Sequence, residues 1–235
     1  YIIGKNEPMN HKNIILIVVS HTDDETLGIG GSIVRHVESG DKVFAISMTD
    51  GVGSRDLNFQ GVDIERLNAA REAAKELNFE WLSGGDFPDN SMDKVGILEV
   101  AKKIEEAKRL VNPNIIYTHS YADLNIDHQI TCKAVLTAFR PQPSEIYEEI
   151  RTFEVPSATD YGHRSTTGYF QPNLYVDITR TWHKKLKALK CYSQEMREFP
   201  HARSLEGLEN LAKLRGNQCG VQLAECFEIL RKIER

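Results

Sequence analysis

Two kinds of hydrophobic pattern alternate along the first part of the chain. Residues 14–19 form an unbroken, mostly β-branched run, Ile-Ile-Leu-Ile-Val-Val, and Val43–Met48 is a second run of this kind. Such runs predict strands that are buried on both faces, as in a parallel sheet. Between Asp63 and Asn78, apolar residues instead recur at helical spacing, which predicts a helix with one apolar side.

The same two patterns continue further along the chain. Helical patterns also cover residues 26–38, 92–111 and 128–139, and Ile115–Thr118 is a further short strand pattern. Strands and helices that alternate in this way form βαβ units. We therefore expect an α/β fold with a doubly wound, mostly parallel sheet and helices on both of its faces.

The pattern changes after Arg140, where two prolines interrupt the chain. The elements predicted beyond them are strands near residues 146–155 and 174–178 and helices near residues 181–196 and 205–216, which complete the chain. No stretch is long enough to be a linker between domains. We expect residues 1–235 to form one domain, in which the part from about residue 141 makes a small cap or an antiparallel edge.

Polar residues gather directly after two of the predicted strands. Residues 21–25, His-Thr-Asp-Asp-Glu, follow the first strand, and residues 119–128, His-Ser-Tyr-Ala-Asp-Leu-Asn-Ile-Asp-His, follow the strand that starts at Ile115. In open α/β sheets, ligands bind at the carboxyl ends of the strands. We therefore expect the two clusters to meet at one edge of the sheet and to form a metal site.

The residue types in these clusters suit a catalytic zinc ion. His21 and Asp24 are separated by a strand-to-helix turn that lets both side chains face one point, and His128 would supply a third ligand. Three protein ligands leave one position open, where zinc lowers the pKa of a water to about 7. Asp23 is then the candidate general base, and Asp127 is a candidate for orienting a ligand or the water.

Each of these residues also has an ordinary structural interpretation. Asp23, Asp24 and Glu25 could serve the amino end of a helix, where carboxylates are stabilising. His128 alone could be a structural or surface residue at the start of a helix. Residues 28–31, Gly-Ile-Gly-Gly, resemble a phosphate-binding loop only weakly, and close packing of their helix on the sheet explains them better.

The composition excludes several classes of partner. There are 34 acidic and 29 basic residues and the net charge is −5, so we expect neither nucleic acid nor an anionic membrane as a partner. The apolar run at residues 14–19 is too short to cross a bilayer. The four cysteines contain no Cys-x-x-Cys pair, which favours free thiols in a reducing, cytoplasmic setting. The sequence leaves homo-oligomer formation open.

The two polar clusters resemble the motifs of a known family. Residues 21–25 resemble the His-Pro-Asp-Asp-Glu signature of the PIG-L/LmbE-like N-acetylglucosaminyl deacetylases, and residues 123–128, Asp-Leu-Asn-Ile-Asp-His, resemble their second motif. The likeness covers nearly the whole chain. Shorter segments similar to the family are Thr49-Asp50-Gly51, the helix beginning at Arg66, Phe87-Pro88-Asp89 and Ala224-Glu225-Cys226-Phe227.

The resemblance implies a Rossmann-like fold and one zinc ion per chain. It implies that His21, Asp24 and His128 hold the ion and that Asp23 is the base. It further implies that Arg66 helps to shape the substrate pocket. The same ligand types also bind iron, cobalt or nickel, so the sequence does not select the metal.

Two positions depart from the family pattern. Thr22 replaces a proline whose only effect is to stiffen the turn. Asn125 stands where many members carry a histidine, and its amide can donate a hydrogen bond to an oxyanion but brings no positive charge. Asn125 is therefore a candidate catalytic residue. Other candidates for the oxyanion donor are His119, His163 and His201.

Substrate contacts are expected from several further residues. The first candidates are Arg66, Asp123 and His119. Further candidates in the last third of the chain are Tyr161, His163, Arg164 and Tyr169. That last group fits a surface loop equally well.

We expect the protein to hydrolyse the N-acetyl amide of an amino sugar or sugar conjugate in a zinc-dependent reaction, releasing acetate and a free amine. One alternative is an amidase of the same design that acts on a thiol–sugar or an antibiotic-like glycoside. An alternative of another class is a non-catalytic sugar- or nucleotide-binding module. The last of these predicts no stoichiometric metal, so metal content separates it from the other two.

Overall fold

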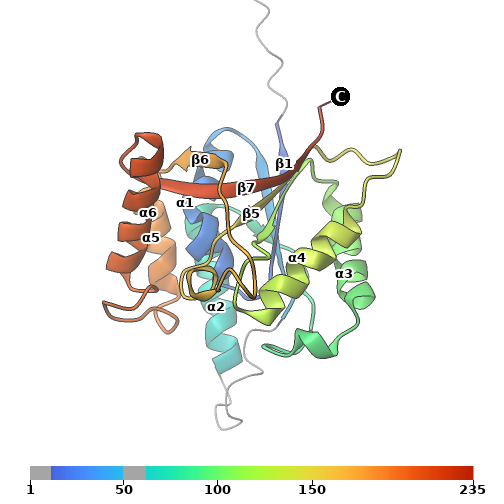
Figure 1. Ribbon diagram of the computed structural model, residues 1–235, viewed down its shortest axis with the longest axis horizontal. Coiled ribbons are helices and arrows are strands. Elements are labelled where there is room, and N and C mark those ends of the chain that lie inside the picture. Colours follow the sequence, from blue (N-terminus) through green and yellow to red (C-terminus); the bar gives the residue numbers. More distant parts are fainter. Residues whose placement is uncertain (1–11, 50–61, 235) are drawn as a thin grey trace, which may run out of the picture.

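One seven-stranded sheet forms the centre of the protein in the computed structural model, which describes residues 12–49 and 62–234 (Figure 1). The strands lie in the order β3-β2-β1-β4-β5-β7-β6. Neighbours from β3 to β5 pair in parallel, whereas β7 is antiparallel to both β5 and β6. The strands are β1 (Ile14–Val19), β2 (Lys42–Ser47), β3 (Glu80–Trp81), β4 (Ile115–His119), β5 (Glu149–Phe153), β6 (Leu174–Asp177) and β7 (Ala224–Lys232).

Helices cover both faces of this sheet. The group α1, α2, α5 and α6 lies on one side and the pair α3 and α4 on the other (Figure 1). This arrangement confirms the predicted single-domain, doubly wound α/β fold. The helices are α1 (Asp24–Glu38), α2 (Val62–Leu77), α3 (Ile97–Val111), α4 (Ile126–Ala138), α5 (Trp182–Cys191) and α6 (Leu205–Cys219), with short 3-10 helices at Met92–Lys94 and Thr159–Tyr161.

The central strand β1 explains why its sequence is an unbroken apolar run. Ile15, Ile17 and Val19 enter the core on the α1 side, whereas Leu16 and Val18 enter the core beneath α3 and α4. All five side chains are fully buried. Burial of each contributes about 1.5–3 kcal/mol, so β1 is a rigid support for the residues that follow it.

The strand order places a switch point at the carboxyl end of β1. Chain connections on the β2 side of β1 run to one edge of the sheet, and those on the β4 side run to the other. The segments after β1 and β4 therefore leave from neighbouring strand ends. This is where ligands bind in open α/β sheets, and it is where the two polar clusters lie.

Helix α1 is kinked at Ile29, which has φ −133° and ψ 15°. Glycines around the kink let the helix approach the sheet closely. A Cβ on Gly28 would lie 2.3 Å from Cδ2 of Phe153, and one on Gly31 would lie 2.7 Å from Cγ2 of Ile178. This confirms that the glycine-rich stretch packs closely against the sheet.

The last strand, β7, was not predicted, and the expectation that helices complete the chain was wrong. This strand lies between β5 and β6. Its Glu225 points inward, where the carboxylate accepts hydrogen bonds from the backbone N–H groups of Gly31 (2.9 Å) and Ser32 (2.7 Å) and pairs with Lys185 (2.6 Å). A buried charge at this position hides the alternating pattern by which a strand is recognised.

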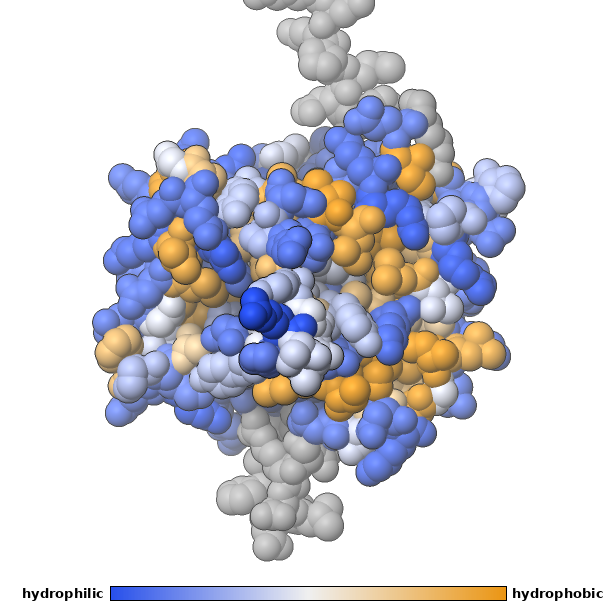
Figure 2. All heavy atoms as spheres, viewed as in Figure 1, coloured by the Kyte–Doolittle hydropathy of each residue, from blue (hydrophilic) through white to orange (hydrophobic). Residues whose placement is uncertain are grey.

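The surface visible in Figure 2 is a mosaic in which apolar side chains form separate patches between polar ones. Scattered apolar side chains are normal on the surface of a folded protein. Within residues 12–49 and 62–234, no helix has both the length and the apolar character needed to cross a membrane.

Candidate metal centre

The turn between β1 and α1 carries the first cluster in an unusual backbone conformation. Asp23 has φ 130° and ψ −30°, a region that residues with a side chain rarely adopt. It occupies the N-cap position of α1, but its side chain makes no capping hydrogen bond. The helix-capping interpretation therefore does not account for Asp23. Such backbone strain costs on the order of 1–3 kcal/mol and is typical of functional sites.

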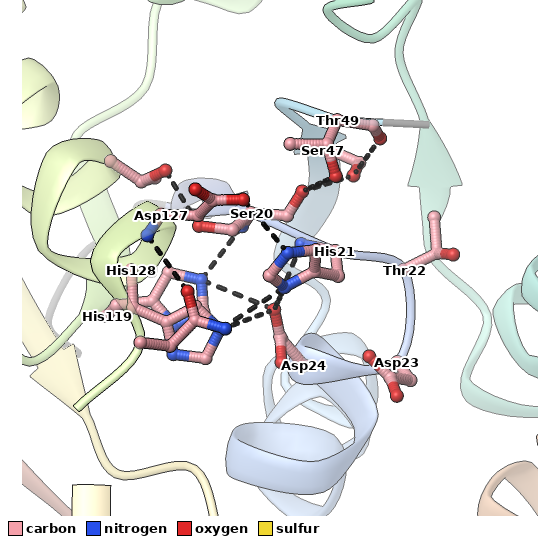
Figure 3. Close-up of polar contacts among 12 residues, drawn as sticks. Ser20, His21, Thr22, Asp23, Asp24, Ser47, Thr49, His119, Asp127 and His128 are labelled. Atoms are coloured by element: carbon pink, nitrogen blue, oxygen red, sulfur yellow. Dashed lines mark hydrogen bonds and ion pairs between the residues drawn. The ribbon is translucent and has the colours of Figure 1, made fainter. Parts of the chain in front are cut away.

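Three buried side chains converge after β1 and β4 (Figure 3). His21 Nδ1 lies 3.2 Å from Asp24 Oδ2 and 3.3 Å from His128 Nε2, and the Asp24 and His128 atoms are 3.4 Å apart. Ligands at the usual zinc distances of about 2.0–2.1 Å in a tetrahedron would be about 3.3–3.4 Å from one another. The three atoms therefore form one face of a tetrahedron of the right size. The second carboxylate oxygen of Asp24, Oδ1, is buried without a hydrogen-bond partner.

In each histidine of this triangle, the ring nitrogen that does not belong to the triangle lies next to a carboxylate. His21 Nε2 lies 3.0 Å from Asp89 Oδ1 and 3.3 Å from Asp127 Oδ2. His128 Nδ1 lies 3.0 Å from Asp123 Oδ2. Carboxylates in this position orient a metal-binding imidazole and raise its basicity. The sequence had drawn attention to Asp127, whereas Asp89 was noted only as part of a turn.

A second group of oxygen and nitrogen atoms could also attract a cation, formed by His21, Asp89 and Asp127. The two oxygens of Asp127 already accept hydrogen bonds from the backbone N–H groups of Asn90 (2.7 Å) and Met92 (3.0 Å). Both oxygens of this carboxylate therefore already have hydrogen-bond donors, and Oδ2 also lies 3.3 Å from His21 Nε2. We favour the His21–Asp24–His128 triangle as the metal site for this reason.

The triangle combines opposite charges in a buried space. Burial alone would lower the pKa of His128, but the nearby carboxylates of Asp24 and Asp123 outweigh it and raise the pKa to about 9. Burial likewise opposes the charge of Asp24, yet His128 and His119 hold its pKa well below the usual value. The carboxylates that stabilise a proton on His128 would also attract a metal cation, which would have to displace that proton.

His119 packs against the triangle through the ring of His128. Its side chain is completely buried and stacks on the ring of His128, with centroids 3.8 Å apart and planes 11° apart. Its Nε2 accepts a hydrogen bond from the N–H of Ser20 (2.8 Å). The ring thus packs in the core next to the triangle, and its role as a substrate contact stays a prediction.

Asp123 and Asn125 are likewise engaged within the loop that precedes α4. Asp123 is fully buried and accepts hydrogen bonds from the N–H of Asn125 (2.8 Å) and the hydroxyl of Thr159 (2.7 Å), and its role as a substrate contact stays a prediction. Asn125 caps α4 by accepting from the N–H of Asp127 (2.9 Å) and donates to Asn90 Oδ1 (3.2 Å). The Asn125 amide thus has structural partners on both sides.

Asp23 lies beside the triangle and contacts two arginines. Its Oδ1 is 3.2 Å from Nη2 of Arg66, and its Oδ2 is 3.2 Å from Nη1 of Arg203. Arg66 also pairs with Glu195 (2.9 Å). Burial raises the pKa of Asp23, although both arginines act to lower it. Sequence reasoning missed Arg203 and Glu195, since neither belongs to a motif and only folding brings Arg203 to Asp23 from 180 residues away.

The aromatic and basic residues predicted near the end of the chain lie in the segment before β6. Tyr161 and Tyr169 are exposed by 53% and 57%. His163 bonds to Ser165, and Arg164 bonds to Tyr169. Both contacts are between residues of this segment, and neither involves the metal triangle.

A buried His-Asp-His triangle with a separate carboxylate beside it, at the switch point of an α/β sheet, is the arrangement expected of a metal-dependent hydrolase. The model of the GlcNAc-PI de-N-acetylase (PIG-L) family matches residues 16–139, more than half of the 235 residues. The chain belongs to this family of hydrolytic N-deacetylases.

Similar proteins have both expected and unexpected activities. The chain is 24% identical over 233 residues to diacetylchitobiose deacetylase of Thermococcus kodakarensis, which covers 94% of this chain and 84% of the relative. It is 25% identical over 189 residues to 4-oxalmesaconate hydratase of Pseudomonas putida, covering 75% and 71%. N,N'-diacetylchitobiose deacetylase from Pyrococcus horikoshii has the same fold, with a TM-score of 0.75, 22% identity, and coverage of 96% and 86%.

Proposed function

We propose that this protein is a metal-dependent deacetylase that hydrolyses the N-acetyl amide of an amino sugar or sugar conjugate and releases acetate and a free amine. The observation that carries the proposal is the buried triangle of His21, Asp24 and His128 with the carboxylate of Asp23 beside it. Such a site combines a place for a cation with an acid–base group that is not one of its ligands.

The donor set favours zinc as the resident ion. Two imidazole nitrogens and one carboxylate oxygen are ordinary zinc ligands, although iron, cobalt and nickel bind the same types. When bound, zinc would supply Lewis-acid chemistry, polarising the acyl carbonyl and making water more acidic. His21, Asp24 and His128 would hold the ion, one per chain.

The remaining residues have roles that follow from their contacts. Asp23 takes a proton from the attacking water and returns it to the nitrogen of the leaving amine. Asp127 and Asp123 keep the imidazoles of His21 and His128 in the orientation that presents the correct nitrogen. Asn125 donates one amide hydrogen to Asn90, and its second amide hydrogen is a candidate donor to the oxyanion.

The substrate class follows from the family and the relatives' names. The family is named for a GlcNAc substrate and the archaeal relatives for diacetylchitobiose. An N-acetylglucosaminide is therefore the first substrate to test, with thiol–sugars and antibiotic-like glycosides as further members of the panel. The free thiols of all four cysteines support a reducing, cytoplasmic setting for this reaction.

The test compares wild type with Asp23→Asn. We expect zinc-loaded wild type to release acetate from N,N'-diacetylchitobiose, and Asp23→Asn to keep one zinc per chain while kcat falls at least about 100-fold. Full turnover by the metal-loaded variant would exclude Asp23 as the base. Hydration of 4-oxalmesaconate is assayed in parallel, because one relative carries that activity in its name. Hydration without acetate release would overturn the deacetylase proposal.

A further inference from the structure

Two arginines from distant parts of the chain hold the two oxygens of one carboxylate. Arg66, on α2, contacts Oδ1 of Asp23, and Arg203, in the connection between α5 and α6, contacts Oδ2. Both distances are 3.2 Å. Among the described residues, no other side chain makes a hydrogen bond or ion pair with this carboxylate. Its orientation therefore depends on the two guanidinium groups.

The two arginines differ in how they are held. Arg66 has further partners: it pairs with Glu195 and donates to the hydroxyl and the carbonyl of Thr22 in the β1–α1 turn. Arg203 is anchored away from the metal triangle, where its Nε donates to the hydroxyl of Ser157 (2.7 Å). The Arg203 side chain is 21% exposed, against 8% for Arg66. Arg203 is thus the more exposed of the two partners of Asp23.

The backbone at Asp23 makes this second contact important. With φ 130°, Asp23 sits in a strained turn that fixes its Cβ, but the carboxylate can still rotate about its own bond. Arg66 alone would hold one oxygen and leave that rotation free. A charge-assisted hydrogen bond from Arg203 to the other oxygen removes it.

We propose that Arg203 is a positioning residue that keeps the Asp23 carboxylate turned toward the attacking water. The proposal rests on the function proposed above, because it assumes that Asp23 is the base. A small misplacement of a catalytic group lowers the rate by about 100-fold, so the effect is measurable.

The test is the kinetics of Arg203→Ala and Arg203→Lys. We expect Arg203→Ala to lower kcat about 100-fold with KM and zinc content unchanged, and guanidinium in the assay to restore part of the rate. Arg203→Lys should lie between Arg203→Ala and wild type. In an Asp23→Asn background, Arg203→Ala should have no further effect. A kcat within threefold of wild type would overturn the proposal.

A matched control separates positioning from stability. Arg215 on α6 forms a closer pair with Glu154, at 2.7 and 2.6 Å, and does not contact Asp23. We expect Arg215→Ala to lower the melting temperature without a loss of kcat that guanidinium restores. A loss restored by guanidinium in both variants would overturn the specific role of Arg203.

A structural measurement makes the result independent of turnover. In a crystal structure of zinc-loaded Arg203→Ala, we expect the Asp23 carboxylate to be rotated or to occupy two orientations. An unchanged, single orientation would overturn the proposal. If wild type releases no acetate but the carboxylate moves in Arg203→Ala, the deacetylase function fails while the positioning role of Arg203 stands.

Discussion

Each histidine of the candidate metal centre uses its two ring nitrogens differently. His21 and His128 turn one ring nitrogen toward the triangle and the other toward a carboxylate. Asp123 in turn is held by the hydroxyl of Thr159 and the N–H of Asn125. The precision of the site therefore comes from residues that would not touch the metal or the substrate.

Replacement of Asp123 by Asn tests this dependence. The amide keeps the shape of the side chain but brings no negative charge to His128 Nδ1. We expect zinc affinity to fall about 10- to 100-fold, as for other groups that orient metal-binding histidines. Competition with a zinc chelator measures the change. Asp93→Asn, at an exposed position near the site, is the control, and an Asp123→Asn affinity equal to that of this control would contradict the prediction.

The four thiols should differ in reactivity according to their burial. Cys132 is fully buried, and burial raises its pKa to about 12. At pH 8 this thiol stays protonated, whereas alkylation requires the thiolate. We expect iodoacetamide to label the exposed Cys219 first, and to reach Cys132 and the buried Cys226 only after unfolding. Mass spectrometry of peptides, with a guanidinium-denatured sample as control, follows the order; early labelling of Cys132 would contradict it.

At the scale of elements, α1 depends on contacts from the far end of the chain. Glu225 on β7 accepts hydrogen bonds from the N–H groups of Gly31 and Ser32 beyond the kink. Lys185 on α5 donates to the carbonyl of Leu27 before the kink (2.8 Å) and to Glu225. The free backbone groups at the kink are thus satisfied by two later elements. This keeps the first turn of α1, with Asp24, against the end of β1.

Gly28→Ala tests the close approach of α1 to the sheet. The new Cβ would lie 2.3 Å from Cδ2 of Phe153 and 3.1 Å from the carbonyl oxygen of Glu154. Alanine favours a helix over glycine by about 1 kcal/mol, but we expect the clash to prevail and to lower the free energy of unfolding by roughly 1–3 kcal/mol.

Urea unfolding measures this change against Gly96→Ala as a control. At Gly96 the nearest atom to a new Cβ is Glu99 Oε1 at 3.8 Å, an ordinary contact. The control should change stability by no more than about 0.5 kcal/mol. Equal stabilities of the two variants would show that α1 can move away from Phe153 at no cost.

At the scale of the whole molecule, the site joins parts of the chain that are far apart in the sequence. His21 and Asp24 follow β1, His128 lies on α4, and Arg203 lies between α5 and α6. A metal ion that binds only the folded chain stabilises it by mass action. The metal centre should therefore contribute to the stability of the entire domain.

Removal of the metal tests this contribution. With free zinc about 1,000-fold above Kd, binding should add about 4 kcal/mol and raise the Tm by roughly 10 °C relative to protein treated with a chelator. Differential scanning calorimetry with and without zinc measures the shift. His128→Ala, which lacks one ligand, should respond far less. An identical Tm for wild type with and without zinc would contradict the metal site.

The sequence by itself determined the layered α/β fold and the positions of the candidate metal ligands. Residues 14–19 are apolar on both faces of a strand, and this local pattern survives folding unchanged. The clusters at His21 and His128 follow strands whose carboxyl ends must share one edge of a parallel sheet. Periodicity and topology are therefore sufficient to bring these ligands together.

Only the tertiary structure decided which neighbours share that site and in what role. In the folded protein, His119 and Asp123 are buried and Asn125 caps α4. Arg203 contacts Asp23. The tertiary structure also added β7, whose inward Glu225 has meaning only beside α1. These outcomes depend on packing between segments far apart in the chain, and a side chain's local sequence carries no information about partners that folding alone brings within reach.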